Sequence, residues 1–204
     1  MSRRIGANGR DTKERILEVA KNEFKSLGYK GASLRLIASS ANVTTGALYF
    51  FFENKDSLFK AVIGEALDPF ITFIAKHYEE ERGMNISSSM DNDLDAVDFI
   101  YDFYLAKRDI WTIIFDNIDI DVVREYLNEF IDMSVTHYKY LIEAHERLDN
   151  KKYNIDEFTI RMFISMQIST IAHTLLNNKD EELLKKHLRE AIIMLRGAYF
   201  SLIS

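Results

Sequence analysis

Small polar residues and cations gather in one short stretch of the chain, residues 33–55, which reads SLRLIASSANVTTGALYFFFENK. Hydroxyl groups and lysine side chains can hold phosphate oxygens, and an arginine can bind a guanine base through two hydrogen bonds. The chemistry on offer is therefore recognition of a nucleic acid. The candidate residues for this recognition are Ser33, Arg35, Thr44, Thr45, Gly46, Tyr49 and Lys55.

Two short helices joined by a tight turn are predicted to position these side chains. The first helix has an apolar stripe at three- and four-residue spacing, formed by Leu34, Ile37, Ala38 and Ala41. Asn42 stands where the chain must turn, and asparagine tolerates the left-handed backbone that such a turn demands. Thr44 can accept a hydrogen bond from the free N–H groups that open the second helix. The pattern predicts a helix-turn-helix, whose second helix enters the DNA major groove.

The segment from Thr12 to Leu58 resembles the DNA-binding domain of the TetR family of bacterial transcriptional regulators. Two positions depart from the family pattern. Asn42 stands where the family commonly has Gly, a change that the turn accepts, and Phe51 stands where His or Tyr is common. The resemblance rests on Thr12, Ile16, Leu17, Ala20, Phe24, Gly28, Tyr29, Ala32, Ser33, Leu34, Ile37, Ala38, Ala41, Val43, Thr44, Gly46, Ala47, Leu48, Tyr49, Phe52, Lys55, Asp56 and Leu58.

The resemblance implies a role for each candidate residue. Thr45 lies at the groove-facing end of the second helix, where side chains reach bases, and Gly46 would allow close approach to DNA. Arg35 matches a position that contacts bases in some relatives, although a phosphate contact or a solvated side chain is an equal alternative. Tyr49 and Lys55 match positions that hold phosphates.

Ser33 and three phenylalanines of this stretch have expected structural roles. Ser33 would cap the first helix and could also offer a phosphate hydrogen bond. Phe50, Phe51 and Phe52 are expected to pack, with Phe52 in the core. Because Phe51 replaces a polar residue, a phosphate contact made at that position in relatives is expected to be missing.

The distribution of charge favours DNA contact at one end of the chain. The 204 residues carry a net charge of −6, but residues 1–60 contain 11 Lys or Arg against 6 Asp or Glu, which leaves +5 there and −11 in the remainder. A basic module joined to an acidic one is expected when one end meets phosphate. Residues 1–10, with Arg3, Arg4 and Arg10, are predicted to be a flexible basic arm that either touches DNA or is merely solvated.

The fold class predicted from the helical patterns is all-α, with about nine helices. One proline and eight glycines favour long helices. The first helix would close at Gly28 and the fourth would begin near Asn54, with a kink or a fresh start at Asp68-Pro69. A polar loop is predicted at 83–93, and later helices at 93–107, 109–118, 121–148, 155–177 and 180–202. The expected domains are the arm 1–10, the helix-turn-helix domain 11–54 and a helical effector-binding and dimerisation domain 55–204.

Several other classes of protein find no support in the sequence. There is no cysteine for a disulfide or a thiolate metal site, and no apolar run long enough to cross a membrane, so the default compartment is the cytoplasm. The five histidines show no metal-ligand pair spacing, and no glycine-rich phosphate loop is present. We therefore expect no enzyme activity, no metal and no cofactor.

By analogy with the family, the middle region is expected to hold an effector pocket. Aromatic residues beside carboxylates could hold a lipophilic cation, although such residues more often pack a core. The candidate pocket residues are Phe70, Phe73, Phe99, Phe103, Trp111, Phe115, Tyr126, Phe130 and Tyr138.

The last two helices are apolar on more than one side, which predicts partners on both sides. In the family these helices pair with their twofold mates. The predicted dimer interface consists of Phe158, Met162, Ser165, Ser169, Ala172, Leu184, Leu188, Ile192, Leu195 and Tyr199.

These observations lead to one hypothesis about function. The chain would be a homodimeric repressor that leaves a palindromic operator when a small hydrophobic or aromatic ligand binds. The alternative is a DNA-binding protein of the same fold controlled by a protein partner, and a helical enzyme is the third possibility.

Overall fold

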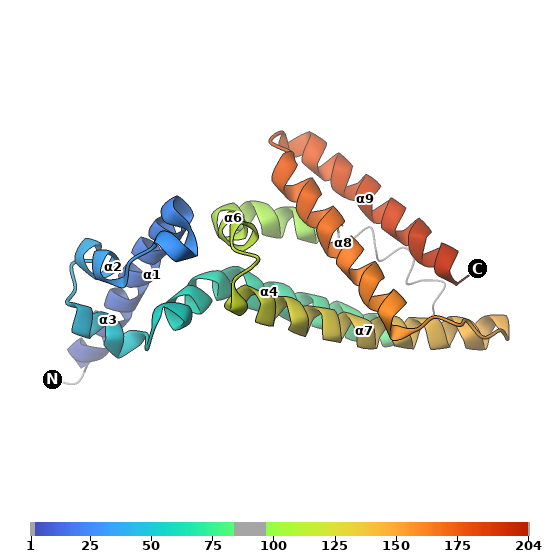
Figure 1. Ribbon diagram of the computed structural model, residues 1–204, viewed down its shortest axis with the longest axis horizontal. Coiled ribbons are helices and arrows are strands. Elements are labelled where there is room, and N and C mark those ends of the chain that lie inside the picture. Colours follow the sequence, from blue (N-terminus) through green and yellow to red (C-terminus); the bar gives the residue numbers. More distant parts are fainter. Residues whose placement is uncertain (1–2, 84–96, 204) are drawn as a thin grey trace. The chain divides into compact units, whose positions relative to one another are not determined.

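The structure, a computed structural model, describes residues 3–83 and 97–203, and every regular element among them is a helix (Figure 1). This confirms the all-α prediction. The helices are α1 (Arg3–Gly31), α2 (Leu34–Ser40), α3 (Thr45–Phe51), α4 (Lys55–Gly83), α6 (Arg108–Asp116), α7 (Asp121–Asp149), α8 (Glu157–Asn177) and α9 (Glu181–Leu202), with a further helical segment over residues 97–106. Within these bounds, no helix is both long and apolar enough to cross a bilayer.

The chain divides into two compact units. Unit 1 comprises Met1–Pro69 and Lys107–Tyr126, and unit 2 comprises Phe70–Ala106 and Leu127–Ser204. The predicted domain boundary after residue 54 therefore falls inside unit 1. Helix α4 contributes to both units and continues through Pro69, so no new helix begins at Asp68.

Two sequence expectations concern the ends of helices. The predicted flexible arm of residues 1–10 is corrected for residues 3–10, because α1 extends back to Arg3, while residues 1–2 lie outside the described residues. Gly28 does end the regular part of α1, since its φ of 67° and ψ of 173° leave the helical region. The predicted loop at 83–93 lies, apart from its first residue, outside the described residues.

The core of unit 1 joins the three N-terminal helices to the first half of α4. Phe24 of α1 meets Phe59 of α4 edge to face, with ring centroids 4.9 Å apart. Around them the apolar stripes read from the sequence are sealed from water, each side chain at most 1% exposed. These buried residues are Ile16, Ala20, Phe24, Ile37, Ala38, Ala41, Leu48, Leu58, Phe59, Val62, Ile63 and Ala66.

Helix α6 belongs to the same unit and fixes the end of α1. The buried side chain of Asn117, just beyond α6, accepts a hydrogen bond of 2.9 Å from the backbone N–H of Tyr29. That N–H follows the left-handed Gly28 and has lost its helical partner, so the amide supplies the missing acceptor. The end of α1 is thereby tied to a residue 88 positions later in the chain.

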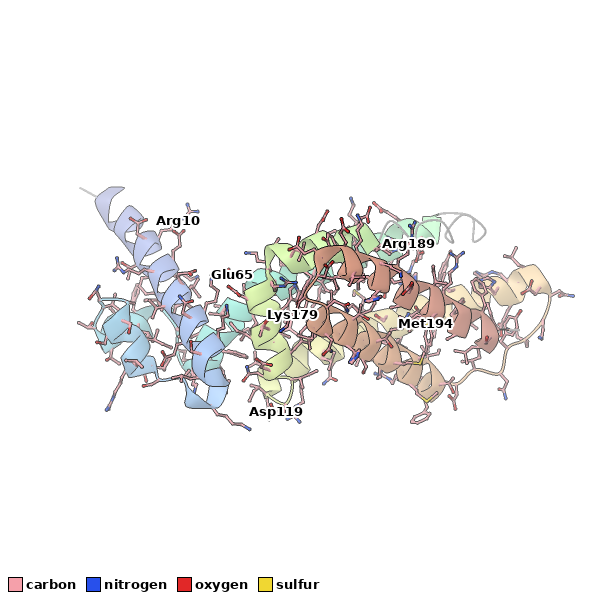
Figure 2. All side chains as sticks on the ribbon, turned by 90° about the horizontal axis from the view of Figure 1, so that it is seen from above. Arg10, Glu65, Asp119, Lys179, Arg189 and Met194 are labelled. Atoms are coloured by element: carbon pink, nitrogen blue, oxygen red, sulfur yellow. The ribbon has the colours of Figure 1, made fainter. Side chains whose placement is uncertain are left out.

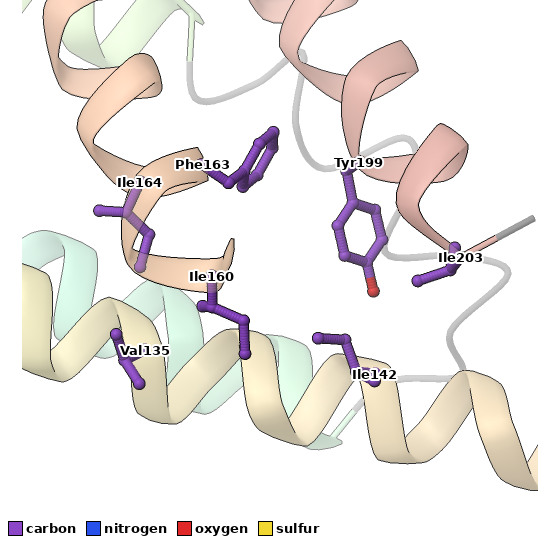
Figure 3. Close-up of a cluster of buried hydrophobic side chains, with 7 residues drawn as sticks. All are labelled: Val135, Ile142, Ile160, Phe163, Ile164, Tyr199 and Ile203. Carbon is purple, nitrogen blue, oxygen red and sulfur yellow. The ribbon is translucent and has the colours of Figure 1, made fainter. Parts of the chain in front are cut away.

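Unit 2 is built from the second half of α4, the helical segment over residues 97–106, α7 from Leu127 onward, α8 and α9. One of its hydrophobic clusters draws on three helices, and Figure 3 shows its seven buried side chains between them. Phe163 of α8 faces Tyr199 near the end of α9, with ring centroids 6.3 Å apart, and Ile160 of α8 lies above α7. Ile164 of α8 belongs to the same cluster. The remaining members of this cluster are Val135, Ile142 and Ile203.

The left-handed turn between α2 and α3 gives a test of the fold. Asn42 has a φ of 53°, a left-handed backbone in which the short polar side chain of asparagine can hydrogen-bond locally, whereas alanine keeps the same Cβ crowding without that compensation. We expect Asn42→Ala to lower the free energy of unfolding by about 1 kcal/mol, and Asn42→Gly to stay close to the parent. Urea unfolding followed by circular dichroism measures both. The exposed Ser40→Ala serves as control, and equal stability of Asn42→Ala and the parent would contradict the assignment.

Candidate nucleic-acid interface

The turn that orients α3 is held by the backbone and by one arginine. The N–H groups of Asn42 and Val43 donate to the carbonyls of Ser39 and Ala38 at 3.1 and 3.0 Å. Arg15 of α1 donates from Nε to the carbonyl of Ala41 at 2.8 Å. Because this bond is partly buried and joins α1 to the turn, it fixes the direction in which α3 leaves.

Helix α3 starts at a side-chain cap, as its sequence predicts. The Thr44 hydroxyl accepts a hydrogen bond of 3.1 Å from the N–H of Ala47. Leu48 is fully buried and anchors one face of α3 to the core, whereas Tyr49 is 51% exposed. The outward face of this helix thus presents Gly46 and Phe50, one turn apart, with Thr45 and Tyr49 on the adjoining side.

Gly46 is not required by the packing of the protein itself. A Cβ built at this position would meet only the Thr44 hydroxyl, at 3.9 Å, which is an ordinary contact. Its backbone is not left-handed either, since Gly28 is the described glycine with a positive φ. The open space in front of Gly46 therefore faces away from the protein, where a closely approaching ligand would lie.

The residues at the start of α2 are available to solvent. Ser33 occupies the N-cap position, but its side chain makes no capping hydrogen bond, so its predicted capping role is corrected. Its exposed hydroxyl keeps its hydrogen-bonding capacity. Arg35 is exposed in the first turn of α2, a placement that suits either a base or a phosphate contact.

Lys55 is held in place at the start of α4. Its Nζ lies 3.4 Å from the carbonyl oxygen of Lys30 and 4.6 Å from the centroid of the Tyr29 ring. The Tyr29 hydroxyl in turn donates to the carboxylate of Asp56, and burial together with this contact raises the pKa of Tyr29 to about 12. The Lys55 cation thus sits over the Tyr29 ring at the start of α4.

The cap of α4 supports this arrangement. The Asn54 side-chain oxygen accepts from the N–H of Ser57 at 2.8 Å, and the Ser57 hydroxyl accepts from the N–H of Asn54 at 3.1 Å. Two otherwise free N–H groups are satisfied by this reciprocal pair. The pair therefore fixes the backbone on both sides of Lys55.

The three consecutive phenylalanines have different surroundings. Phe52 is 4% exposed, as expected for the core, and Phe51 is half-buried. Phe50 is 83% exposed, so its predicted packing role is wrong. The helical period could have predicted this exposure. Phe50 lies two residues after the buried Leu48, about 200° around the helix and therefore on the outer side.

The predicted pocket residues do not form one group. Trp111, Phe115 and Tyr126 belong to unit 1, where Tyr126 donates to the Asp68 carboxylate at 2.7 Å. Tyr138 belongs to unit 2 but packs edge to face on Phe163, with ring centroids 5.3 Å apart. The other five residues form one phenylalanine cluster in unit 2: Phe70, Phe73, Phe99, Phe103 and Phe130.

A polar cluster that was not predicted lies in unit 2. Glu81, 7% exposed, lies 2.8 Å from Nε2 of His137 and 3.9 Å from Nε2 of His77. Tyr78 stacks on His137 with centroids 3.8 Å apart, and Nδ1 of His137 is buried without a hydrogen-bond partner. In the described residues, no three such side chains are arranged to hold a metal ion. No pattern in the sequence could have predicted this pair, because Glu81 and His137 are 56 residues apart and meet only through tertiary packing.

The predicted dimer residues divide between the surface and the interior. On α8, Phe158 and Met162 are 75% and 56% exposed, Ser165 and Ser169 are exposed, and Ala172 is half-buried. On α9 the assignment is corrected for four residues that are buried inside the chain, Leu184, Leu188, Leu195 and Tyr199, while Ile192 is half-buried. The exposed apolar residues of α9 are instead Leu183, Ile193 and Met194, the last of which Figure 2 labels.

Comparison with known proteins places this geometry in context. Residues 16–62 match the family model described as bacterial regulatory proteins, tetR family. The HTH-type transcriptional repressor BepR of Brucella suis is 42% identical over 67 residues, which cover 33% of this chain and 32% of BepR. The chain thus spans about a third of the length of the curated relatives that it matches.

Solved structures resemble the chain over a greater length. A transcriptional regulator of the TerR/AcrR family from Aquifex aeolicus VF5 has a TM-score of 0.61 at 21% identity, covering 90% of this chain and 98% of its own. The regulator FadR from Bacillus subtilis, solved with stearoyl-CoA, has a TM-score of 0.62 at 16% identity, covering 89% and 96%. At these identities the likeness shows a shared fold.

Gly46 provides a test of the interface. We expect Gly46→Ala to leave the free energy of unfolding unchanged or to raise it by up to about 1 kcal/mol, because alanine is the better helix former. Affinity for DNA should fall roughly tenfold, since the new methyl group opposes close approach of α3. Thermal unfolding and fluorescence anisotropy with labelled DNA measure the two effects. A variant that is stable and binds DNA as tightly as the parent would contradict the role of Gly46.

Proposed function

Residues 16–62 belong to the tetR family of bacterial regulatory proteins, and on that premise we propose that the whole chain is a DNA-binding transcriptional repressor. The observation that carries this proposal is the outward face of α3, which is open at Gly46 and anchored on its opposite side by the buried Leu48. Helix α3 would enter the major groove, with Thr45 and Arg35 contacting bases.

The phosphate contacts of the proposal come from both ends of the helix-turn-helix. Ser33 and Tyr49 offer exposed hydroxyl groups, and Lys55 offers a cation held beside the start of α4. Thr44 uses its hydroxyl oxygen as the cap of α3, so its role in binding is to fix the helix. Such contacts position a protein on the DNA backbone, whereas base contacts choose the sequence.

The charge of Lys55 gives the first test of this function. Lys55→Ala should weaken binding to all DNA sequences, because one DNA phosphate would no longer be neutralised by the protein. The slope of log affinity against log salt concentration should become shallower by about 0.9 for each such phosphate. Anisotropy titrations at several salt concentrations measure the slope on a site selected from random DNA.

Lys60→Ala is the matched control for that titration. Lys60 also lies on α4 and is exposed, whereas Lys55 is half-buried, and Lys60 pairs with Glu125 at 3.7 Å. Removing either lysine changes the net charge equally. An unchanged slope for Lys55→Ala, or the same reduction for Lys60→Ala, would show that the local phosphate contact is absent.

We further propose a twofold dimer formed through α8 and α9. Apart from Glu157 and Arg161 near its start, which are ion-paired with each other and with Lys139 and Asp132, the exposed side of α8 carries no Asp, Glu, Lys or Arg, which suits an interface that excludes water. Its members are Phe158, Met162, Ser165, Met166, Ser169, Ala172, His173 and Leu176. On α9, Leu183, Ile193 and Met194 would add to it. The dimer would relate two helix-turn-helix segments by a twofold axis, which matches a palindromic operator. Each of these segments, residues 33–55 of one chain, is called a reading head.

A charge on this side of α8 tests the dimer. Met162→Asp should raise the dimer dissociation constant about 100-fold, because a carboxylate would be buried without a partner. Analytical ultracentrifugation over a range of protein concentrations measures the constant. Asn128→Asp adds the same group at an exposed position of α7 and should have no effect. A Met162→Asp variant that stays fully dimeric would place the interface elsewhere.

The signal that releases the repressor is proposed to be a small hydrophobic or aromatic ligand bound in unit 2. The phenylalanine cluster offers apolar surface, and Glu81 with His137 offers hydrogen-bonding groups in the same unit. The structure of FadR from Bacillus subtilis contains stearoyl-CoA, which supports a ligand with a large apolar part. Because α4 has residues in both units, a ligand that moves its second half would act on the reading head through a continuous helix.

A further inference from the structure

The most exposed large apolar side chain in the described part of the protein is Phe50, at 83%. It projects from the outward face of α3, one turn after Gly46, where the neighbouring side chain is absent and space is open. Exposure of a whole phenyl ring to water is unfavourable, so the free energy falls when a partner covers a ring held in this position. The reading head therefore presents an apolar contact among its polar ones.

The ring of Phe50 is also supported from behind. Phe51 is half-buried, and its ring meets that of Phe50 edge to face, with centroids 5.1 Å apart and planes at 86°. This is a favourable aromatic geometry, and it restricts where the Phe50 ring can lie. The phenylalanine that replaces a polar family residue at position 51 thus acts as a positioning residue for its neighbour.

The chemistry of the major groove limits what such a ring can contact. A phenyl group can neither donate nor accept a conventional hydrogen bond, so it cannot read the polar edges of guanine, cytosine or adenine. Thymine alone among the standard bases presents a methyl group in that groove, at C5. Burial of that methyl group against the ring removes apolar surface of both partners from water.

We propose that Phe50 is a specificity-determining residue that reads the C5-methyl group of a thymine in each half-site. This inference rests on the proposed function, because it requires α3 to lie in the major groove. It adds a rule about sequence: each half-site contains a thymine at the position that faces the C-terminal end of α3, one turn along the helix from the base pair nearest Gly46.

Deoxyuridine gives a direct test, since it differs from thymidine only by lacking this methyl group. A binding site is first selected from random double-stranded DNA with the parent protein, and each thymine is then replaced in turn. At one thymine per half-site, we expect the replacement to weaken binding of the parent about fourfold, the factor that corresponds to one buried methylene-sized group. Fluorescence anisotropy measures the dissociation constants.

Phe50→Ala completes the test as a double-substitution cycle. This variant should bind the thymine site more weakly than the parent and should show no further loss when that thymine becomes deoxyuridine. Because Phe50 is exposed, the substitution should leave the melting temperature unchanged. Leu36→Ala is the matched control, since Leu36 is an apolar residue of α2 that is 48% exposed, and it should keep the deoxyuridine effect in full.

The outcomes separate this inference from the proposed function. If the parent selects a site but no deoxyuridine replacement weakens binding, or if the loss persists in Phe50→Ala, the reading of thymine is overturned while DNA binding stands. If the parent selects no sequence, the proposed function fails and the inference fails with it. A change of oligomeric state in Phe50→Ala would show that a second copy of the chain covers the ring, and would also overturn the inference.

Discussion

The placement of α3 depends on one backbone constraint, the left-handed residue at Asn42. That residue reverses the chain within a few positions, and the turn is secured by the bond from Arg15 to the Ala41 carbonyl and by the Thr44 cap. Leu48 then fixes the rotation of α3 about its own axis. The roles proposed for Thr45, Gly46, Tyr49 and Phe50 follow from this direction and rotation, since they decide which side chains of α3 face outward.

The sequence contained enough information for the local structure of this region. Apolar spacing located α2 and α3, and the tolerance of asparagine for a left-handed backbone located the turn, because both properties depend on residues close together in the chain. The surroundings of Phe50 were predictable in principle from the helical period. They were missed because three consecutive phenylalanines look like a run of core residues, although consecutive helical positions point in different directions.

The inner and outer sides of α8 and α9 could not be assigned in the same way. Both helices are apolar on more than one side, so their composition does not say which side the chain itself covers. The structure buries Leu184 and Leu188 and leaves Ile193 and Met194 exposed, a choice made by contacts with distant parts of the chain. The pairing of Glu81 with His137 has the same origin. Sequence periodicity reports local order, whereas these features depend on tertiary packing.

The proline in α4 has a mechanical consequence. Pro69 has no N–H, so the carbonyl of Glu65 one turn earlier lacks its usual partner at the position where the helix passes from one unit to the other. Elsewhere in α4, bending requires stretching a regular ladder of bonds, but here one rung is already missing. The helix therefore bends most easily at Pro69. A force on either half of α4 changes the direction of the helix there at the smallest cost in free energy.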